Sequence, residues 1–291
     1  MIEWHDHIPR AVSYLPIMAA ILTSLSADAF VRPVSQSKQD CRPSNSQIKY
    51  QKPVVEHYSE LVEKVGIIGT TDDRVEDRTW ETEYSVKVVC KQKNGKYSLV
   101  GSSQITEYKN VISTNSHLFY DDDCKLKYKI SDCGVLDTTG GGAKRVAFVG
   151  PGDFGTKCPS QSLEKSKDWA VLKIAREIDV TPIKICDDSN LGLNDQIQVV
   201  SSVDSKRNKT IESMRLKQSC KVIGSSYEGI ATDCDTNPGN SGSAVLKGKC
   251  LAGLVYWVPD VDYQEADPSF NTTRLVPISD GFRESIKNAS K

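Results

Sequence analysis

The chain has 291 residues, of which 38% are hydrophobic and 26% are charged, and its formal net charge is −1 at pH 7. This length suits two domains or one large all-β unit once an N-terminal leader is removed. A charge so near zero gives no large electrostatic footprint for nucleic acid or an anionic membrane, so we expect no nucleic-acid partner and no stable membrane association. Low-complexity tracts and internal repeats are absent from the sequence, which has the composition of a globular protein.

The first predicted element is an apolar segment over residues 11–29. Arg10 places a positive charge before it, and Ala27-Asp28-Ala29 matches the small-residue pattern at which signal peptides are cut. We therefore predict a signal peptide over residues 1–29, with cleavage after Ala29, and a secreted or periplasmic protein. The segment is short for a membrane span, and an uncleaved membrane anchor is the alternative.

Residues 30–64 are polar and contain three prolines, with one short helical pattern near their end. We predict a pro-segment or an extended N-terminal arm here rather than a domain. The run Lys64-Val65-Gly66-Ile67 is a candidate processing site.

The pattern of β-strands begins near residue 83. Tyr84, Val86 and Val88 alternate with Ser85 and Lys87, so we expect one apolar face. A hairpin turn is predicted at Asn94-Gly95. Further strands are predicted over residues 99–105, 111–113 and 145–149, closing at Ile174.

The second half repeats this pattern of short strands and ends in a helix. Its candidate strands are residues 197–200, 214–216, 220–223, 243–246 and 251–256. Ile278, Phe282 and Ile286 then recur at a spacing of four, with the capping pair Ser279-Asp280 after the first of them, which predicts a short amphipathic C-terminal helix. Many short strands with regular turns indicate an all-β protein built as a sandwich or a pair of barrels.

The run Pro238-Gly239-Asn240-Ser241-Gly242-Ser243-Ala244-Val245 has the features of a hydrolase nucleophile on a tight turn. Its glycines let the backbone bend and let a substrate come close. We expect Ser241 to be the nucleophile. The backbone N–H groups of Gly239 and Ser241 would form an oxyanion hole for a tetrahedral intermediate.

A serine nucleophile needs a base and a group that orients the base. His117 is our candidate base because it follows an apolar strand that runs into small polar residues. Asp168 is our candidate orienting group because it precedes the buried-strand pattern Trp169–Ile174. The run Asp121–Asp123 is a nearby acidic alternative, although three like charges in a row are typical of a solvated loop.

The order His117, then Asp-Trp-Ala-Val-Leu, then Gly-Asn-Ser-Gly-Ser resembles that of the trypsin-like serine peptidases. Within them, Asn240 and the segment 67–75 are similar to the bacterial glutamyl-endopeptidase branch. The resemblance implies an all-β, chymotrypsin-like fold of two six-stranded antiparallel β-barrels with a short C-terminal helix. It places His117 and Asp168 in the first barrel, residues 65–180, and Ser241 and the pocket in the second barrel with the helix, residues 181–291.

The resemblance further implies a serine endopeptidase that acts through an acyl-enzyme on protein or peptide substrates, as a monomer and without a cofactor. In animal trypsins a freed N-terminal amine pairs with an aspartate next to the nucleophile. Asn240 carries no charge at that position, so that switch is in doubt here. Lipases and esterases are excluded, because they use the order Ser, Asp, His and no histidine follows Ser241. A non-catalytic binding protein on the same fold is the competing class.

The residues that would line the substrate pocket leave the side-chain preference open. Asp235 lies where trypsin-type enzymes place a pocket-base aspartate, which favours cleavage after Arg or Lys provided that its carboxylate faces the pocket. Thr236 lies where glutamyl endopeptidases use a hydroxyl, so glutamyl specificity is the alternative. Val255, Tyr256 and Trp257 are expected to form the strand that lines the pocket, although the two aromatic residues would also suit a core.

All nine cysteines follow Ala29, which in an exported chain indicates disulfides. The most specific predicted pair is Cys220 with Cys234, which flank the strands leading to Ser241. The remaining predicted pairs are Cys124 with Cys133, Cys158 with Cys186, and Cys90 with Cys250, leaving Cys41 unpaired. No paired C-x-x-C units occur, so we expect no zinc or other metal site.

Overall fold

The computed structural model describes residues 72–140, 142–160, 162–204, 215–226, 229–257 and 272–291. The chain divides into two units, Met1–Pro53 and Val54–Lys291, and every described residue belongs to the second unit. The predicted signal peptide over residues 1–29, the predicted arm over residues 30–64 and Cys41 all lie outside the described residues.

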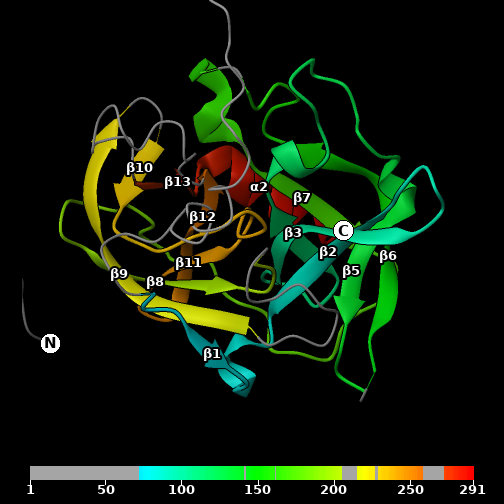
Figure 1. Cartoon of the computed structure of the whole chain (residues 1–291), viewed down its shortest axis with the longest axis horizontal. Coiled ribbons are helices and arrows are strands. Elements are labelled where there is room, and N and C mark those ends of the chain that lie inside the picture. The colour runs from blue at the N-terminus through cyan, green and yellow to red at the C-terminus, as the bar shows by residue number, and fades with distance from the viewer. Residues whose placement is uncertain (1–71, 141, 161, 205–214, 227–228, 258–271) are drawn as a thin grey trace, which may run out of the picture. The chain divides into compact units, whose positions relative to one another are not determined.

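The first six long strands close into an antiparallel β-barrel (Figure 1). In order around the barrel they are β2 (Ser85–Lys91), β3 (Tyr97–Ile105), β4 (Val111–Thr114), β7 (Ala170–Ile174), β6 (Lys144–Phe154) and β5 (Cys133–Asp137). The hairpin between β2 and β3 turns at the predicted Asn94-Gly95 pair, where Gly95 has a φ of +81° and the Asn94 carboxamide oxygen accepts the N–H of Lys96. Short 3-10 turns lie at Trp80–Thr82, Ser116–Leu118, Ile130–Asp132 and Ser162–Lys167.

The second half of the chain closes into another six-stranded antiparallel barrel. Its strands, in order, are β8 (Gln196–Ser201), β9 (Arg215–Ser226), β10 (Gly229–Thr232), β13 (Thr273–Pro277), β12 (Cys250–Trp257) and β11 (Ala244–Lys247). A seventh strand, β1 (Val75–Asp77), precedes the first barrel in sequence but pairs with β9 of the second. The predicted chymotrypsin-like pair of barrels is therefore confirmed.

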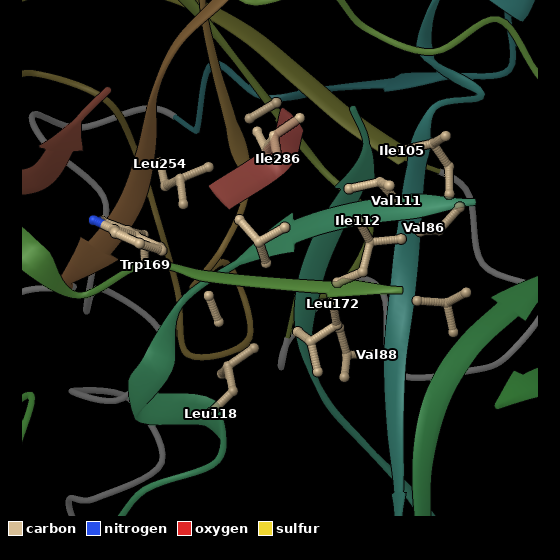
Figure 2. Close-up of a cluster of buried hydrophobic side chains, with 14 of the residues drawn as sticks. Val86, Val88, Ile105, Val111, Ile112, Leu118, Trp169, Leu172, Leu254 and Ile286 are labelled. Atoms are coloured by element: carbon tan, nitrogen blue, oxygen red, sulfur yellow. The ribbon is translucent and has the colours of Figure 1, made fainter. Parts of the chain in front are cut away.

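The C-terminal helix α2 (Asp280–Ala289) is capped as predicted, because the Ser279 hydroxyl accepts the N–H of Phe282. Phe282 packs on Trp169 of the first half, with 5.3 Å between the ring centroids. One continuous hydrophobic cluster contains the interior of the first barrel, residues of the second barrel and this helix. Figure 2 shows Trp169, Leu254 and Ile286 among the side chains of that cluster. The barrels thus share a core, which fixes the two halves of the described chain against each other.

Strand β2 differs from the expectation of a single apolar face. Ser85 and Lys87 are buried along with their alternating neighbours, because residues of the second barrel cover that face. The Arg215 guanidinium donates to the carbonyl of Ser85, and the hydroxyl of Ser202 donates to the carbonyl of Val86. Burial and the charge of Arg215 lower the pKa of Lys87 to about 8.

Four disulfides are present among the described residues, and only one predicted pair is correct. Cys220 bonds to Cys234 as expected. The other predicted pairs are wrong, since the bonds are Cys90–Cys133, Cys124–Cys158 and Cys186–Cys250. Cys90 and Cys133 are directly opposed on the neighbouring strands β2 and β5, a pairing that sequence spacing does not reveal. Disulfides of this number are typical of proteins in an oxidising, extracellular environment.

No helix formed by the described residues combines the length and the apolar character needed to cross a membrane.

Candidate active site

His117 lies in the 3-10 turn Ser116–Leu118, immediately beyond the end of β4. Strand β4 pairs with β7, so the residues after β4 come beside those before β7. Two side chains join these segments: the Asn115 amide donates to the Asp168 carbonyl and the Ser116 hydroxyl donates to the Trp169 carbonyl, both over 2.6 Å. The β-ladder and these two bonds together hold His117 against Asp168.

The carboxylate of Asp168 receives two hydrogen bonds from His117. The backbone N–H donates to Oδ1 over 2.9 Å, and the ring Nδ1 lies 2.6 Å from Oδ2. The Asp168 side chain is 2% exposed, whereas that of His117 is 28% exposed. A proton on Nδ1, facing the carboxylate, leaves Nε2 as the basic nitrogen of the neutral ring. This is the tautomer that a general base for a serine requires.

The acidic run at residues 121–123 has a different role. Asp121 Oδ1 accepts the N–H groups of Asp123 and Lys125 in an exposed turn. Asp123 forms an exposed ion pair with Lys125. These carboxylates belong to a solvated loop, as a run of like charges indicates.

Ser241 lies in the tight turn that leads into β11. Gly239 and Gly242 on either side of it have φ values of +99° and +80°, a region that favours glycine. A Cβ added to Gly242 would lie 2.2 Å from both the Ser102 carbonyl oxygen and the Thr114 hydroxyl. The predicted need for glycine therefore has two causes, the backbone conformation and the close approach of the first barrel.

The N–H groups of this turn fall into two sets. Those of Asn240, Gly242 and Ser243 donate to carbonyl oxygens over 2.9, 2.7 and 2.9 Å. Those of Gly239 and Ser241 donate to no described residue. Two N–H groups without an acceptor in the described part of the chain are what an oxyanion hole needs.

The Ser241 turn contacts the first barrel close to the segment that carries His117. The N–H of Ser102 on β3 donates to the Ser241 carbonyl over 2.9 Å. A Cβ added to Gly101 would lie 2.6 Å from a methyl group of Leu118, the residue after His117, and 3.1 Å from the Ser241 carbonyl oxygen. The two segments therefore meet over the same point of β3.

Asp235, Thr236 and Val255, which are expected to line the pocket, are buried, and the first two form hydrogen bonds with other residues of the chain. The Asp235 carboxylate accepts the N–H of Asp73 over 3.0 Å. The hydroxyl of Thr236 lies 2.6 Å from that of Thr273, which donates to the Cys234 carbonyl. Val255 joins the Ser241 turn, because its carbonyl accepts the N–H of Gly242.

The other two residues expected to line the pocket lie on the same strand as Val255. Tyr256 is buried on β12. Trp257 ends that strand, and its side chain lies outside the described residues.

Sequence reasoning missed Ser102, a residue of the first barrel that contacts the Ser241 turn. Its hydroxyl donates to the Gly239 carbonyl over 3.1 Å and accepts the N–H groups of Ser202 and Val203 over 3.2 and 3.0 Å. A serine inside a strand carries no motif, so only the folded chain reveals this contact. Within the described part of the chain, no cluster of three or more His, Cys, Asp or Glu side chains is arranged to hold a metal ion.

Comparisons with known proteins agree with this architecture. The family model of the trypsin-like peptidase domain matches residues 99–252, more than half of the chain. The chain therefore belongs to the trypsin-like peptidase family. No curated protein sequence matches it.

Solved structures share the fold at low sequence identity. One is a Glu endopeptidase in complex with MPD, 18% identical, with a TM-score of 0.56 over 77% of this chain and 99% of that one. Another is an inactivated protease paralogue of the scabies mite, 12% identical, with a TM-score of 0.54 over 73% and 96% of the two chains. A thermostable serine protease, AL20, from an extremophilic microorganism is 11% identical, with a TM-score of 0.54 over 73% and 99%.

Proposed function

We propose that the chain is a secreted serine endopeptidase with His117, Asp168 and Ser241 as its catalytic triad. The observation that carries the proposal is the pair of hydrogen bonds by which Asp168 holds both the backbone and the ring of His117. The family match and the contact of the Ser241 turn with the first barrel add support.

The mechanism follows from these roles. Ser241 Oγ attacks the carbonyl carbon of the scissile peptide bond and passes its proton to His117 Nε2. Asp168 stabilises the imidazolium that forms, and the N–H groups of Gly239 and Ser241 stabilise the oxyanion. The carbon–nitrogen bond then breaks, the leaving amine takes the proton from His117, and the acyl group remains on Ser241.

Deacylation repeats these steps with water. His117 removes a proton from water as its oxygen attacks the acyl carbon. The proton then returns to Ser241 Oγ as the ester bond breaks. The products are a peptide amine and a peptide carboxylic acid.

A serine-reactive phosphonate probe tests the proposal, because only an activated serine is labelled. We expect the wild-type protein to be labelled at Ser241 and to cleave peptides. Ser241→Ala should lose labelling and cleavage while keeping its four disulfides and its melting temperature. A wild-type protein that resists the probe would support the alternative, a non-catalytic binding protein. Most of the hydrolysis surviving in Ser241→Ala would refute the role of this serine.

Side-chain preference is a second part of the proposal. We propose cleavage after Arg or Lys, for which the charge of Asp235 must act inside the pocket. The N–H of Asp73 already occupies one oxygen of that carboxylate, which weakens the case. Glutamyl specificity through Thr236 is the alternative, although the bond between Thr236 and Thr273 engages that hydroxyl.

A positional-scanning peptide library distinguishes the two preferences. Cleavage after Arg or Lys, lost in Asp235→Asn, would support the first. Cleavage after glutamate, lost in Thr236→Val, would support the second.

Secretion and processing complete the proposal. We propose that the signal peptide is cut after Ala29 and that residues 30–64 are removed as a pro-segment. N-terminal sequencing of the secreted protein tests both steps. A mature chain beginning at Phe30 would support the signal peptide and contradict removal of the arm.

A further inference from the structure

A buried arginine lies close to the residues that precede Ser241. The Arg74 side chain is only 3% exposed. Its guanidinium group donates to both carboxylate oxygens of Asp72, over 2.7 and 2.8 Å, and to the carboxylate of Asp204. Asp204 is fully buried. Arg74 thus joins the segment before β1 to a residue next to the turn.

Asp204 connects this ion pair to the turn through Asn237. The side-chain amide of Asn237 donates to the two Asp204 oxygens over 3.3 and 3.2 Å. Its own Oδ1 has no hydrogen-bond partner among the described residues, so the carboxylate sets the orientation of the amide. The N–H of Asn237 in turn donates to Asn240 Oδ1 over 2.6 Å. This chain of contacts ends on the residue directly before Ser241.

The backbone at residues 203–204 also contacts the turn. The Asn240 amide donates to the Val203 carbonyl over 2.8 Å. A Cβ added to Gly239 would lie 2.9 Å from the Val203 side chain and 3.5 Å from the Asp204 backbone. Residues 203–204 therefore pack closely on Gly239, whose N–H belongs to the proposed oxyanion hole.

The charges in this cluster depend on one another. Burial alone would lower the pKa of Arg74, but its hydrogen bond to Asp72 and the charges of Asp204, Asp72 and Asp235 raise that pKa. Arg74 therefore stays charged. Removal of one partner from a buried ion pair is strongly destabilising, because it leaves the other charge uncompensated.

We propose that Arg74 is a positioning residue of the active site, which acts through Asp204 and Asn237 to fix Gly239 and Asn240. This inference rests on the proposed serine peptidase function. Asp73 adds a second link, since its N–H donates to Asp235 six residues before Ser241. All these links are made by side chains and by backbone N–H groups within the chain. None of them requires a new N-terminal amine produced by a cut before residue 72.

The experiment compares Arg74→Met and Arg74→Lys with the wild-type protein. We expect Arg74→Met to fold but to lose about 10- to 100-fold in kcat, because small displacements of catalytic groups are costly. KM should change less, and the rate of phosphonate labelling should fall in parallel with kcat. Arg74→Lys keeps the charge and should recover part of both rates. Asp204→Asn, which keeps the side-chain volume, should lose kcat as Arg74→Met does. It replaces Arg74→Met as the test variant if Arg74→Met does not fold.

Arg176→Met is the control for the loss of an arginine–aspartate pair elsewhere in the chain, because Arg176, whose side chain is 50% exposed, pairs with Asp137 over 2.6 Å in the first barrel. It should leave kcat within about twofold of wild type. A purely structural role for Arg74 would lower the melting temperature and leave kcat and the labelling rate of the folded variants unchanged. That result would overturn the positioning role of Arg74 but not the proposed peptidase function. Failure of the wild-type protein to react with the probe would instead refute the proposed function, and the inference with it.

Discussion

The two halves of the proposed active site are held in different ways. His117 and Asp168 follow and precede neighbouring strands, and the ladder between β4 and β7 brings them together. The turn of Ser241 is instead held by polar contacts with distant segments, including Ser102, Asp204 and Val255. The first half is thus a property of one barrel, whereas the second depends on both barrels and on the segment before β1.

This difference predicts how each half responds to mutation. A change in the first half should remove one catalytic role and leave the rest of the site in place. A change in the second half should displace several groups at once, because the oxyanion donors and the nucleophile share one turn. Three substitutions test the contrast, each with activity and stability measured together.

Asp168→Asn should have the largest effect on activity with little change in fold. The amide carries no negative charge to stabilise the imidazolium, and its NH2 group can donate to His117 Nδ1 and so favour the wrong tautomer of the ring. A loss of about 10⁴ in kcat is expected. The rate is measured with a peptide amide substrate, and the melting temperature shows whether the barrel is intact. A variant that keeps more than about a tenth of the wild-type kcat would show that Asp168 does not orient the base.

Gly242→Ala should break the second half. The new Cβ would clash with the Ser102 carbonyl and the Thr114 hydroxyl at 2.2 Å and would also occupy a positive φ. Displacement of the Ser241 turn should lower kcat by about 10² or more. Gly248→Ala is the control, since Gly248 has a φ of +64° with nothing within 4 Å of an added Cβ. Equal loss of activity in both variants would contradict a specific role for the contact with the first barrel.

The same contrast explains which features were predictable from the sequence. His117, Asp168 and Ser241 stand in short runs whose local composition indicates their chemistry, and the strands alternate or turn at recognisable residues such as Asn94-Gly95. Arg74 and Asp204 have no such signal, because their role arises from contacts over 130 residues of sequence. Cys90 and Cys133 pair for the same reason, since register across β2 and β5 sets which cysteines face each other.

The burial of Lys87 shows a further limit of pattern reading. Alternation along β2 indicates one apolar face, but the opposite face is covered by the second barrel rather than by water. The polar face of an alternating strand can thus be covered either by solvent or by a second barrel. The sequence of one strand does not contain that information.

Ser102→Ala should have the smallest effect of the three and sharpens the comparison most. It removes one hydroxyl that bonds to Gly239, Ser202 and Val203, and leaves the backbone contact between Ser102 and Ser241 in place. Loss of a buried hydrogen-bonding group costs about 1–2 kcal/mol. If this cost destabilises the catalytically active conformation of the Ser241 turn, kcat drops about 5- to 30-fold.

The neighbouring Ser103→Ala provides the control for that measurement. Its hydroxyl is equally buried and donates to the Val86 carbonyl over 3.1 Å, within the first barrel and away from the turn. Ser103→Ala should lose less stability in denaturant unfolding than Ser102→Ala, because it removes one hydrogen bond instead of three and the Val86 carbonyl keeps its bond from the Ser202 hydroxyl. Only Ser102→Ala should lose kcat. Similar kcat losses in the two variants would mean that the serine half responds to the stability of the first barrel as a whole, and that the contact through Ser102 has no separate part in placing the Ser241 turn.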